Sequence, residues 1–193
     1  MPFSDPPPTA AWKHGDVQVG FEVVFFEPTD DGLRIEGATS AVEEGEPWAV
    51  SYVLELDREW VTRSAVVHGR SRSGDSELTL EADGAGGWTA NGEPVPEVEG
   101  CTDVDLEASA MTNAFPVHRF GLEVGEESEA PATYVRALDL RVERLEQRYK
   151  RKPDDGKRQR YDYVSVADGF EAELVYDEAG LVLDYPGIAV RAL

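Results

Sequence analysis

The chain has 193 residues, of which 39 are acidic and 18 basic, and its formal net charge at pH 7 is -21. This charge excludes nucleic acid as an expected partner, because binding to phosphates depends on Lys and Arg side chains. The single cysteine, Cys101, excludes an intrachain disulfide and a multi-thiolate zinc site. The first residues lack the pattern of a signal peptide, and no apolar run reaches the ~20 residues of a membrane span. We therefore expect a soluble, cytoplasmic protein.

The acidity also predicts a habitat. A net charge of this size destabilises a compact state through self-repulsion unless salt screens it. We expect the chain to come from a halophilic cell with a high-salt cytoplasm, so that the charge reflects the solvent and not a partner.

Short alternating segments separated by Gly, Pro and Asp predict an all-β fold. Residues 1–10 are expected to form a flexible N-terminal tail, and residues 11–193 a single all-β domain with about a dozen strands in a curled sheet. In chain order, the expected strands are 17–26, 32–37, 48–57, 60–68, 77–82, 102–106, 117–124, 161–166, 170–176 and 181–185.

Two of the expected hairpins resemble each other. The segments YVLELDREWVTR and AELVYDEAGLVLDYPG share alternating apolar residues, an Asp, two linking residues and a second apolar strand. This likeness leaves open an internal duplication with two similar halves, although unrelated hairpins share the same pattern.

The segment YVRALDLRVERLEQRYKRK (134–152) satisfies two periodicities. Leu138, Leu140 and Val142 alternate with charged residues as in a strand, whereas Leu138, Val142, Leu145 and Tyr149 have helical spacing. The Glu and Arg content favours a helix. The residues alone leave the choice open.

The stretch GCTDVDLEASAMTNAFPVHRFGL (100–122) carries most of the candidate chemistry. As a strand, its first part places Cys101, Asp103 and Asp105 on one face. A metal site made of Cys101, an aspartate and His118 is weakly supported, because no second Cys or His lies near. General acid–base catalysis would pair Asp103 or Asp105 with His118.

A structural interpretation of the same residues competes with catalysis. Buried charges must be matched, so the two aspartates are expected to pair with Arg119 and Arg63 inside the β framework. We favour this interpretation over a catalytic one.

Aromatic residues recur along the expected strands. On strands they fill a core or line an apolar ligand pocket, and the sequence does not separate these uses. The candidates for lining a groove are Trp48, Tyr52, Trp60, Tyr134, Tyr163 and Phe170.

Six motifs resemble, in their order, the putative glycolipid-binding protein family. They are DREWVTR, GGWTANG, GCTDVDLEASAMTNAFPVHRF, EQRYKR, YDYVS and DEAGLVLDYPG, and the resemblance spans about residues 12–191. It implies a spiral β-roll, which makes 134–152 part of the sheet. The family usually has two arginines where this chain has His118 and Arg119, which implies a weaker grip on an anionic head group.

The resemblance implies a lipid- or glycolipid-binding protein that holds an apolar ligand in a β-roll groove, with no catalysis, no cofactor and no metal. A polar seam along this groove, structural or ligand-binding, is expected from Arg63, Cys101, Asp103, Asp105, Asn113, His118 and Arg119. Two alternatives stay open: a hydrolase or isomerase that uses Asp103 or Asp105 with His118, and a non-catalytic β scaffold for a protein partner. No oligomeric state is predicted.

Overall fold

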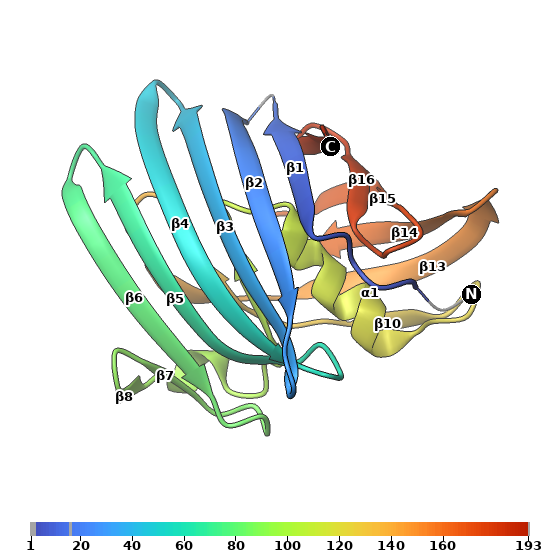
Figure 1. Cartoon of the computed structure of the whole chain (residues 1–193), viewed down its shortest axis with the longest axis horizontal. Coiled ribbons are helices and arrows are strands. Elements are labelled where there is room, and N and C mark those ends of the chain that lie inside the picture. The colour runs from blue at the N-terminus through green and yellow to red at the C-terminus, as the bar shows by residue number, and fades with distance from the viewer. Residues whose placement is uncertain (1–2, 16, 193) are drawn as a thin grey trace.

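A computed structural model describes residues 3–15 and 17–192 of the chain (Figure 1). The strands are β1 (Thr9–His14), β2 (Gln18–Pro28), β3 (Gly32–Glu43), β4 (Glu46–Asp57), β5 (Thr62–Ser71), β6 (Gly74–Ala82), β7 (Trp88–Ala90), β8 (Glu93–Pro94), β9 (Asp103–Leu106), β10 (Glu127–Glu129), β11 (Ala132–Val135), β12 (Val142–Leu145), β13 (Gln147–Asp155), β14 (Arg158–Ser165), β15 (Phe170–Tyr176), β16 (Val182–Tyr185) and β17 (Ala189–Arg191). The helical elements are the 3-10 turns η1 (Pro96–Val98) and η2 (Met111–Asn113) and the helix α1 (Ala114–Phe120). The all-β prediction is confirmed.

One curled sheet of 14 strands forms the frame of the molecule. Its order is β10-β13-β14-β15-β16-β17-β1-β2-β3-β4-β5-β6-β7-β8, and its pairs are antiparallel. Strands β1–β8 make one meander and β13–β17 another, and the pairing of β17 with β1 joins them. The two end strands, β10 and β8, do not pair with each other, so the curled sheet stays open.

Residues 95–146, here called the insert, connect the two meanders and pack between them. Within the insert, β9, β11 and β12 form a separate three-stranded sheet in which β9 and β11 are parallel. Helix α1 lies between the arm made of β1–β6 and the arm made of β13–β16 (Figure 1). Met111 and Phe115 are fully buried in one cluster with Ile35 and Leu54 of the large sheet. Burial of each such side chain stabilises the fold by about 1.5–3 kcal/mol. The insert therefore forms the core inside the curled sheet.

The strand expected at 117–124 is wrong, because this segment begins inside helix α1. Ala114, Phe115 and Val117 are buried, and Pro116 occupies the first turn, where its missing N–H costs no hydrogen bond. Gly121 ends the helix in the left-handed conformation, at φ 55°. A helix of two turns buries its apolar residues against the sheet without needing a strand partner.

The segment 134–152 contains strands, as the family resemblance implies. It contributes to β11, β12 and β13, and β11 pairs with β12 in an antiparallel hairpin. Leu140, between them, adopts a positive φ of 56° and is buried. Helix propensity is therefore overridden by pairing within the sheets.

The N-terminal residues lie against the domain over their described part. The Ser4 backbone N–H donates to the Glu178 carbonyl at 2.8 Å, and the Phe3 ring lies 4.6 Å from the ring of His118. Thr9 and Ala10, expected in the tail, belong to β1. Residues 1 and 2 lie outside the described part of the chain.

A buried carboxylate fastens the insert to the large sheet. Glu22 of β2 is 0% exposed and accepts hydrogen bonds from the Tyr52 hydroxyl at 2.7 Å and from the Ala110 backbone N–H at 2.9 Å. Ser109 donates to the same carboxylate, and His14 Nε2 lies 3.2 Å from it. Strands β1, β2 and β4 thus hold one loop of the insert through a single side chain.

Gly37 makes room for this arrangement. It pairs with Tyr52 across β3 and β4, and a Cβ at this position would lie 2.2 Å from the Tyr52 ring. The absence of a side chain lets the ring lie over the β3 backbone, so that its hydroxyl reaches Glu22.

The two similar hairpins share one turn. Asp57 and Asp177 each accept, on Oδ1, the backbone N–H groups two and four residues later, at distances of 2.9–3.0 Å. The residue three positions later has a positive φ in both turns, 63° for Trp60 and 69° for Gly180. The likeness between the sequences therefore corresponds to a shared turn, one in each arm of the sheet.

Replacing Glu22 by Gln should destabilise the protein strongly. The amide nitrogen cannot accept the hydrogen bonds that one carboxylate oxygen accepts, so buried donors lose their partner at about 1–3 kcal/mol each. We expect urea unfolding to show a loss of about 3 kcal/mol. Glu36→Gln, on the exposed face of β3, is the matched control and should change stability by under about 0.5 kcal/mol. Equal effects of the two changes would show that the Glu22 network does not fasten the insert.

Candidate functional site

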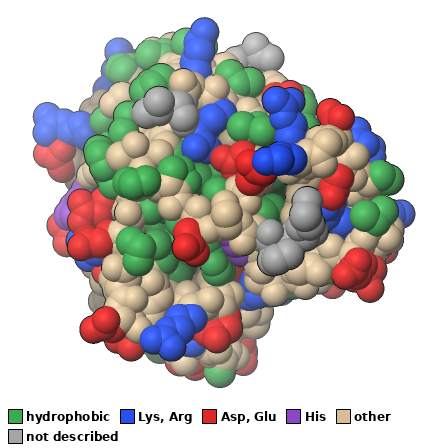
Figure 2. All heavy atoms as spheres, turned by 45° about the vertical axis from the view of Figure 1, so that its right-hand side comes forward, with side chains coloured by type: hydrophobic (Ala, Val, Ile, Leu, Met, Phe, Trp, Pro, Cys, Tyr) green, Lys and Arg blue, Asp and Glu red, His purple; other side chains and the backbone are tan. Residues whose placement is uncertain are grey.

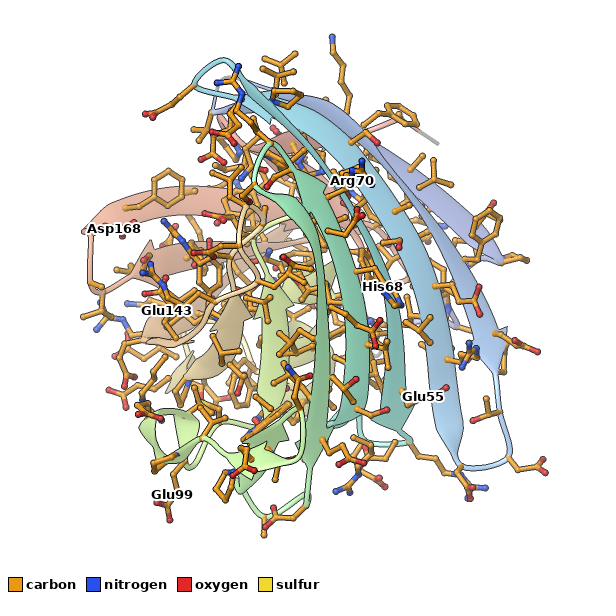
Figure 3. All side chains as sticks on the ribbon, turned by 90° about the vertical axis from the view of Figure 1, so that its left-hand side faces the viewer. Glu55, His68, Arg70, Glu99, Glu143 and Asp168 are labelled. Atoms are coloured by element: carbon orange, nitrogen blue, oxygen red, sulfur yellow. The ribbon has the colours of Figure 1, made fainter. Side chains whose placement is uncertain are left out.

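A cavity of about 510 Å³ lies where the insert meets the C-terminal arm of the sheet. Its walls come from β9 and the loop after it, from the β11–β12 hairpin, from β14–β16 and from the β1–β2 turn. Glu143 and Asp168, both in its lining, lie near each other on one side of the molecule in Figure 3. The volume falls within the roughly 300–1,000 Å³ of pockets that hold small molecules.

Aromatic rings form one part of the lining. Tyr163, Phe170 and Tyr185 come from β14, β15 and β16, and their ring centroids lie 5.7–6.3 Å apart. Burial raises the pKa of the hydroxyls of Tyr163 and Tyr185, so both stay neutral hydrogen-bonding groups. Tyr134 of β11 adds a fourth ring.

A carboxyl group and an amide lie in the same cavity. Asp105 accepts a hydrogen bond from Thr112 Oγ1 at 2.8 Å, and Asn113 Oδ1 accepts one from the Tyr149 hydroxyl at 2.9 Å. The Asn113 carbonyl accepts a further one from the Tyr176 hydroxyl at 3.1 Å. These bonds fix the two side chains that present polar atoms to the cavity.

The electrostatic surroundings of Asp105 favour its neutral form. Burial is the largest cause and, with the charges of Asp103 and Glu107, raises the pKa of Asp105 to about 6. Hydrogen bonds from Thr112 and Gln147 work in the opposite direction and are outweighed. Asp105 therefore takes up a proton at a pH closer to neutral than an ordinary aspartate does.

Arginines of the β11–β12 hairpin also line the cavity, in pairs with carboxylates. Arg136 Nη1 lies 3.0 Å from Glu107 Oε1, and Arg136 Nε lies 3.3 Å from Glu143 Oε1. Arg141 Nη2 lies 3.3 Å from the same Glu143 oxygen. Glu107, Arg136, Arg141 and Glu143 are therefore matched among themselves.

A second hollow, of about 450 Å³, lies on the outer face of β3–β6. Its lining carries the exposed ion pairs of His68 with Glu77 and of Arg70 with Asp75, and small residues such as Ser51. His68 and Arg70 mark this face in Figure 3. Its lining contains no Phe, Tyr or Trp ring and no buried titratable group, so the cavity of the insert is the candidate site.

The groove residues predicted from the sequence separate into two groups. Tyr134, Tyr163 and Phe170 line the cavity. Trp48 and Tyr52 instead belong to the core beneath the insert. Trp60 packs against the same core at its margin and stacks on another ring, as described below.

The predicted polar seam separates in the same way. Asp105 and Asn113 reach the cavity. Asp103 is buried and forms a two-pronged ion pair with Arg119, whose Nε lies 3.2 Å from Oδ1 and whose Nη2 contacts Oδ2. Burial raises the pKa of Asp103 despite this cation. The pairing with Arg119 is as predicted, and neither residue lines the cavity.

The expected pairing of Arg63 with these aspartates is wrong. Arg63 Nη2 lies 2.5 Å from Asp57 Oδ2, at the turn between β4 and β5. The Arg63 side chain points outward from β5 and is 43% exposed, so it pairs with Asp57 at the turn and does not reach the buried aspartates.

Cys101 and His118 have structural surroundings. The buried Cys101 thiol lies 3.4 Å from Arg144 Nη1, and burial raises its pKa. The His118 ring stacks on Trp60 at 3.6 Å and 9°, and its Nε2 donates to the Ala179 carbonyl at 3.0 Å. Burial lowers the pKa of His118 to about 4. The neutral His118 ring thus packs between the Asp57 turn and the Asp177 turn, and it does not line the cavity that contains Asp105.

Several residues of the site were not singled out by the sequence. Glu107 and Ser109 follow β9 in a loop, Arg136 directly follows β11, and Tyr185 ends β16. The available pointers were two family motifs: GCTDVDLEASAMTNAFPVHRF contains Glu107 and Ser109, and DEAGLVLDYPG contains Tyr185.

The family described as "Putative glycolipid-binding" matches residues 9–191. The chain belongs to this family. Its structure is similar to a solved structure of a DUF1089 family protein from Pseudomonas aeruginosa, with 36% sequence identity, coverage of 86% of this chain and 90% of that chain, and a TM-score of 0.76. It also matches a β-barrel-like protein of the domain of unknown function DUF1849 from Brucella abortus, with 11% identity, coverage of 95% and 93%, and a TM-score of 0.49. Among proteins with curated descriptions, none matches the chain.

The family resemblance inferred from six sequence motifs is therefore confirmed, and it extends over nearly the whole chain. Within residues 3–15 and 17–192, no helix is long and apolar enough to cross a bilayer. The same residues contain no group of three or more His, Cys, Asp or Glu side chains placed to hold a metal ion.

Replacing Asp105 by Asn should change the pH dependence of stability. A carboxyl group whose folded pKa is raised stabilises the fold fully below its unfolded pKa, and loses this contribution as pH rises through the folded pKa. Wild type should therefore weaken relative to Asp105→Asn by roughly 3 kcal/mol between about pH 3 and pH 7.5, at 1.36 kcal/mol per pKa unit. Urea unfolding at both pH values measures the difference.

Asp168→Asn is the control for this experiment. Hydrogen bonds from Ser165 and from the Phe170 N–H lower the pKa of Asp168, so its stability difference should have the opposite sign. A wild-type-to-Asp105→Asn difference that stays constant with pH would show that Asp105 titrates normally.

Replacing Asp103 by Ala should leave the Arg119 guanidinium, 18% exposed, without its partner. Breaking a buried pair in this way costs about 3–5 kcal/mol. Thermal or urea unfolding should show that loss. Asp75→Ala removes a pair with Arg70 in which both side chains are 71% exposed, and should cost at most about 1 kcal/mol. Similar losses in the two variants would mean that the Asp103–Arg119 pair is open to water in solution.

Proposed function

We propose that this protein binds a glycolipid and that the sugar head group occupies the cavity of the insert. Membership of the glycolipid-binding family supports a lipid ligand. The cavity lining supports the choice of its sugar end, since rings and hydrogen-bonding groups share one space.

The observation that carries the proposal is the presence of Tyr163, Phe170 and Tyr185 in one cavity with Asp105 and Asn113. A sugar ring has an apolar face of C–H groups and an edge of hydroxyls. Aromatic rings accommodate the face, while a carboxylate accepts hydrogen bonds from the hydroxyls and an amide both donates to them and accepts from them.

An acyl chain fits this lining less well. Hydrocarbon against Asp105 and Asn113 would take polar atoms out of water without a hydrogen bond in return, which costs free energy. We therefore place the acyl chains outside the cavity, in contrast to the sequence-based expectation of an apolar ligand within the groove.

The proposed function is binding without catalysis. The catalytic alternative requires His118 beside Asp103 or Asp105, but the His118 ring stacks on Trp60 and its Nε2 donates to the Ala179 carbonyl.

The high-salt cytoplasm inferred from the net charge stays a prediction.

Titration calorimetry with a soluble alkyl glycoside, in molar KCl, tests the proposal. Wild type should bind saturably, and Phe170→Ala should bind about two- to tenfold more weakly, because an aromatic contact contributes about 0.5–1.5 kcal/mol. Phe25→Ala, which removes an exposed ring from the outer face of β2, is the matched control and should bind as wild type does. Absence of binding to wild type, or equal weakening by both changes, would overturn the proposal.

A further inference from the structure

An apolar stripe runs along the outer face of the sheet and begins at the cavity. It consists of Val17, Val19, Phe21, Phe25, Val42 and Val190, which are 44–63% exposed. Val19, Phe21 and Phe25 lie on β2, while Val42 pairs with Val19 from β3. Val17, in the β1–β2 turn, lines the cavity as well. Figure 2 shows hydrophobic side chains gathered on the face that carries β1 and β2.

The backbone beneath the stripe is fully used by the sheet. Strand β2 pairs with β3 along its whole length and with β1 over residues 20–25, which include both phenylalanines of the stripe. An extended peptide therefore cannot add to it as a new strand, and a partner meets side-chain carbon alone. Such a surface suits hydrocarbon, which needs no hydrogen bonds.

The charge around the stripe is unlike that of the chain as a whole. Across β1 and β3, the neighbours of Phe21 are Lys13 and Ser40, although the chain has 39 acidic residues. Acidic groups begin at its borders, with Glu36 beside Phe25 and Asp184 beside Val190. The stripe is thus a place where an otherwise anionic surface can approach lipid.

Its size favours a lipid surface over a second copy of the chain. Six half-exposed side chains present a few hundred Å² of apolar surface, whereas specific protein interfaces bury about 800 Å² on each partner. Insertion of apolar side chains into the boundary between head groups and acyl chains needs no comparable area.

We infer that the stripe docks on the lipid surface of a membrane and brings the cavity mouth, at Val17, to the head groups. The inference rests on the proposed function: the sugar enters the cavity while its acyl chains stay in the bilayer. The partner of the stripe is therefore the bilayer itself, and the stripe contacts its hydrocarbon and not its charged groups.

Flotation with vesicles of phosphatidylcholine, with and without a glycosyl diacylglycerol, tests the inference in molar KCl. Wild type should bind both kinds, and bind more tightly when the glycolipid is present. The double change Phe21→Ser with Phe25→Ser should weaken binding to plain vesicles at least about tenfold, since each ring withdraws apolar area from water. The double variant should bind the soluble alkyl glycoside as wild type does.

A valine pair supplies the matched control. Val19→Ser in the stripe should weaken vesicle binding about threefold or more. Val124→Ser should leave it unchanged, because Val124 is similarly exposed, at 56% against 63%, but lies in the loop before β10. Equal effects of the two serines would overturn the inference.

The remaining outcomes separate the two proposals. Binding of the soluble glycoside without binding to vesicles would overturn the stripe inference and leave the sugar site standing. Binding to plain vesicles, lost in the stripe variants, without binding of the glycoside would support the stripe and overturn the sugar site. A wild-type dimer that the stripe variants convert to a monomer, with no vesicle binding, would assign the stripe to a second copy.

Discussion

The fold depends on filling an open curl. A sheet of 14 strands that does not close leaves an inner apolar face, and burying that face is the dominant favourable term in folding. The insert supplies the filling, and the Glu22 carboxylate fixes its position through Tyr52, Ser109 and the Ala110 N–H. A charge at 0% exposure is tolerated because donors surround it. Burial of apolar side chains is non-directional, so the hydrogen bonds of Glu22 are what fix the insert in one position against the sheet.

The cavity follows from the same arrangement. The insert packs closely under β1–β6, where Phe115 and Met111 are fully buried. Against the C-terminal arm, Val117 and Ala130 of the insert join a buried cluster, whereas Asp105 and Asn113 present polar side chains to the cavity. Polar groups held by Thr112 and Tyr149 cannot close on the rings of Tyr163 and Phe170 as a hydrocarbon core would. The space that remains is lined by both kinds of group. This mixed lining is why a sugar suits it better than an acyl chain.

Strands were predicted correctly from the sequence where apolar and polar residues alternate along them. Strands β2–β6 of the first meander were found because their alternation is one-sided: one face is buried and the other meets solvent. Strands β1, β7 and β8 were not predicted. The helix at Ala114–Phe120 was missed, since seven residues carry too few turns for a helical period and its apolar residues also suit a strand. Of the site, Asp105 and Asn113 were found through a motif and Tyr134, Tyr163 and Phe170 through their residue type. Trp48 and Tyr52 have the same chemistry but fill the core.

The sequence by itself determined the all-β class, the acidic surface, the family and the two Asp turns, because each is written in composition, period or a short motif. Only the tertiary structure decided which polar groups meet. Glu22 and Ser109 are 87 positions apart, and Asp103 finds Arg119 and not Arg63. Such pairs depend on how the sheet curls around the insert, and curl is a sum over many strands that no local pattern records. The same curl places Trp48 and Tyr52 in the packed core and brings Tyr134, Tyr163 and Phe170 to the cavity.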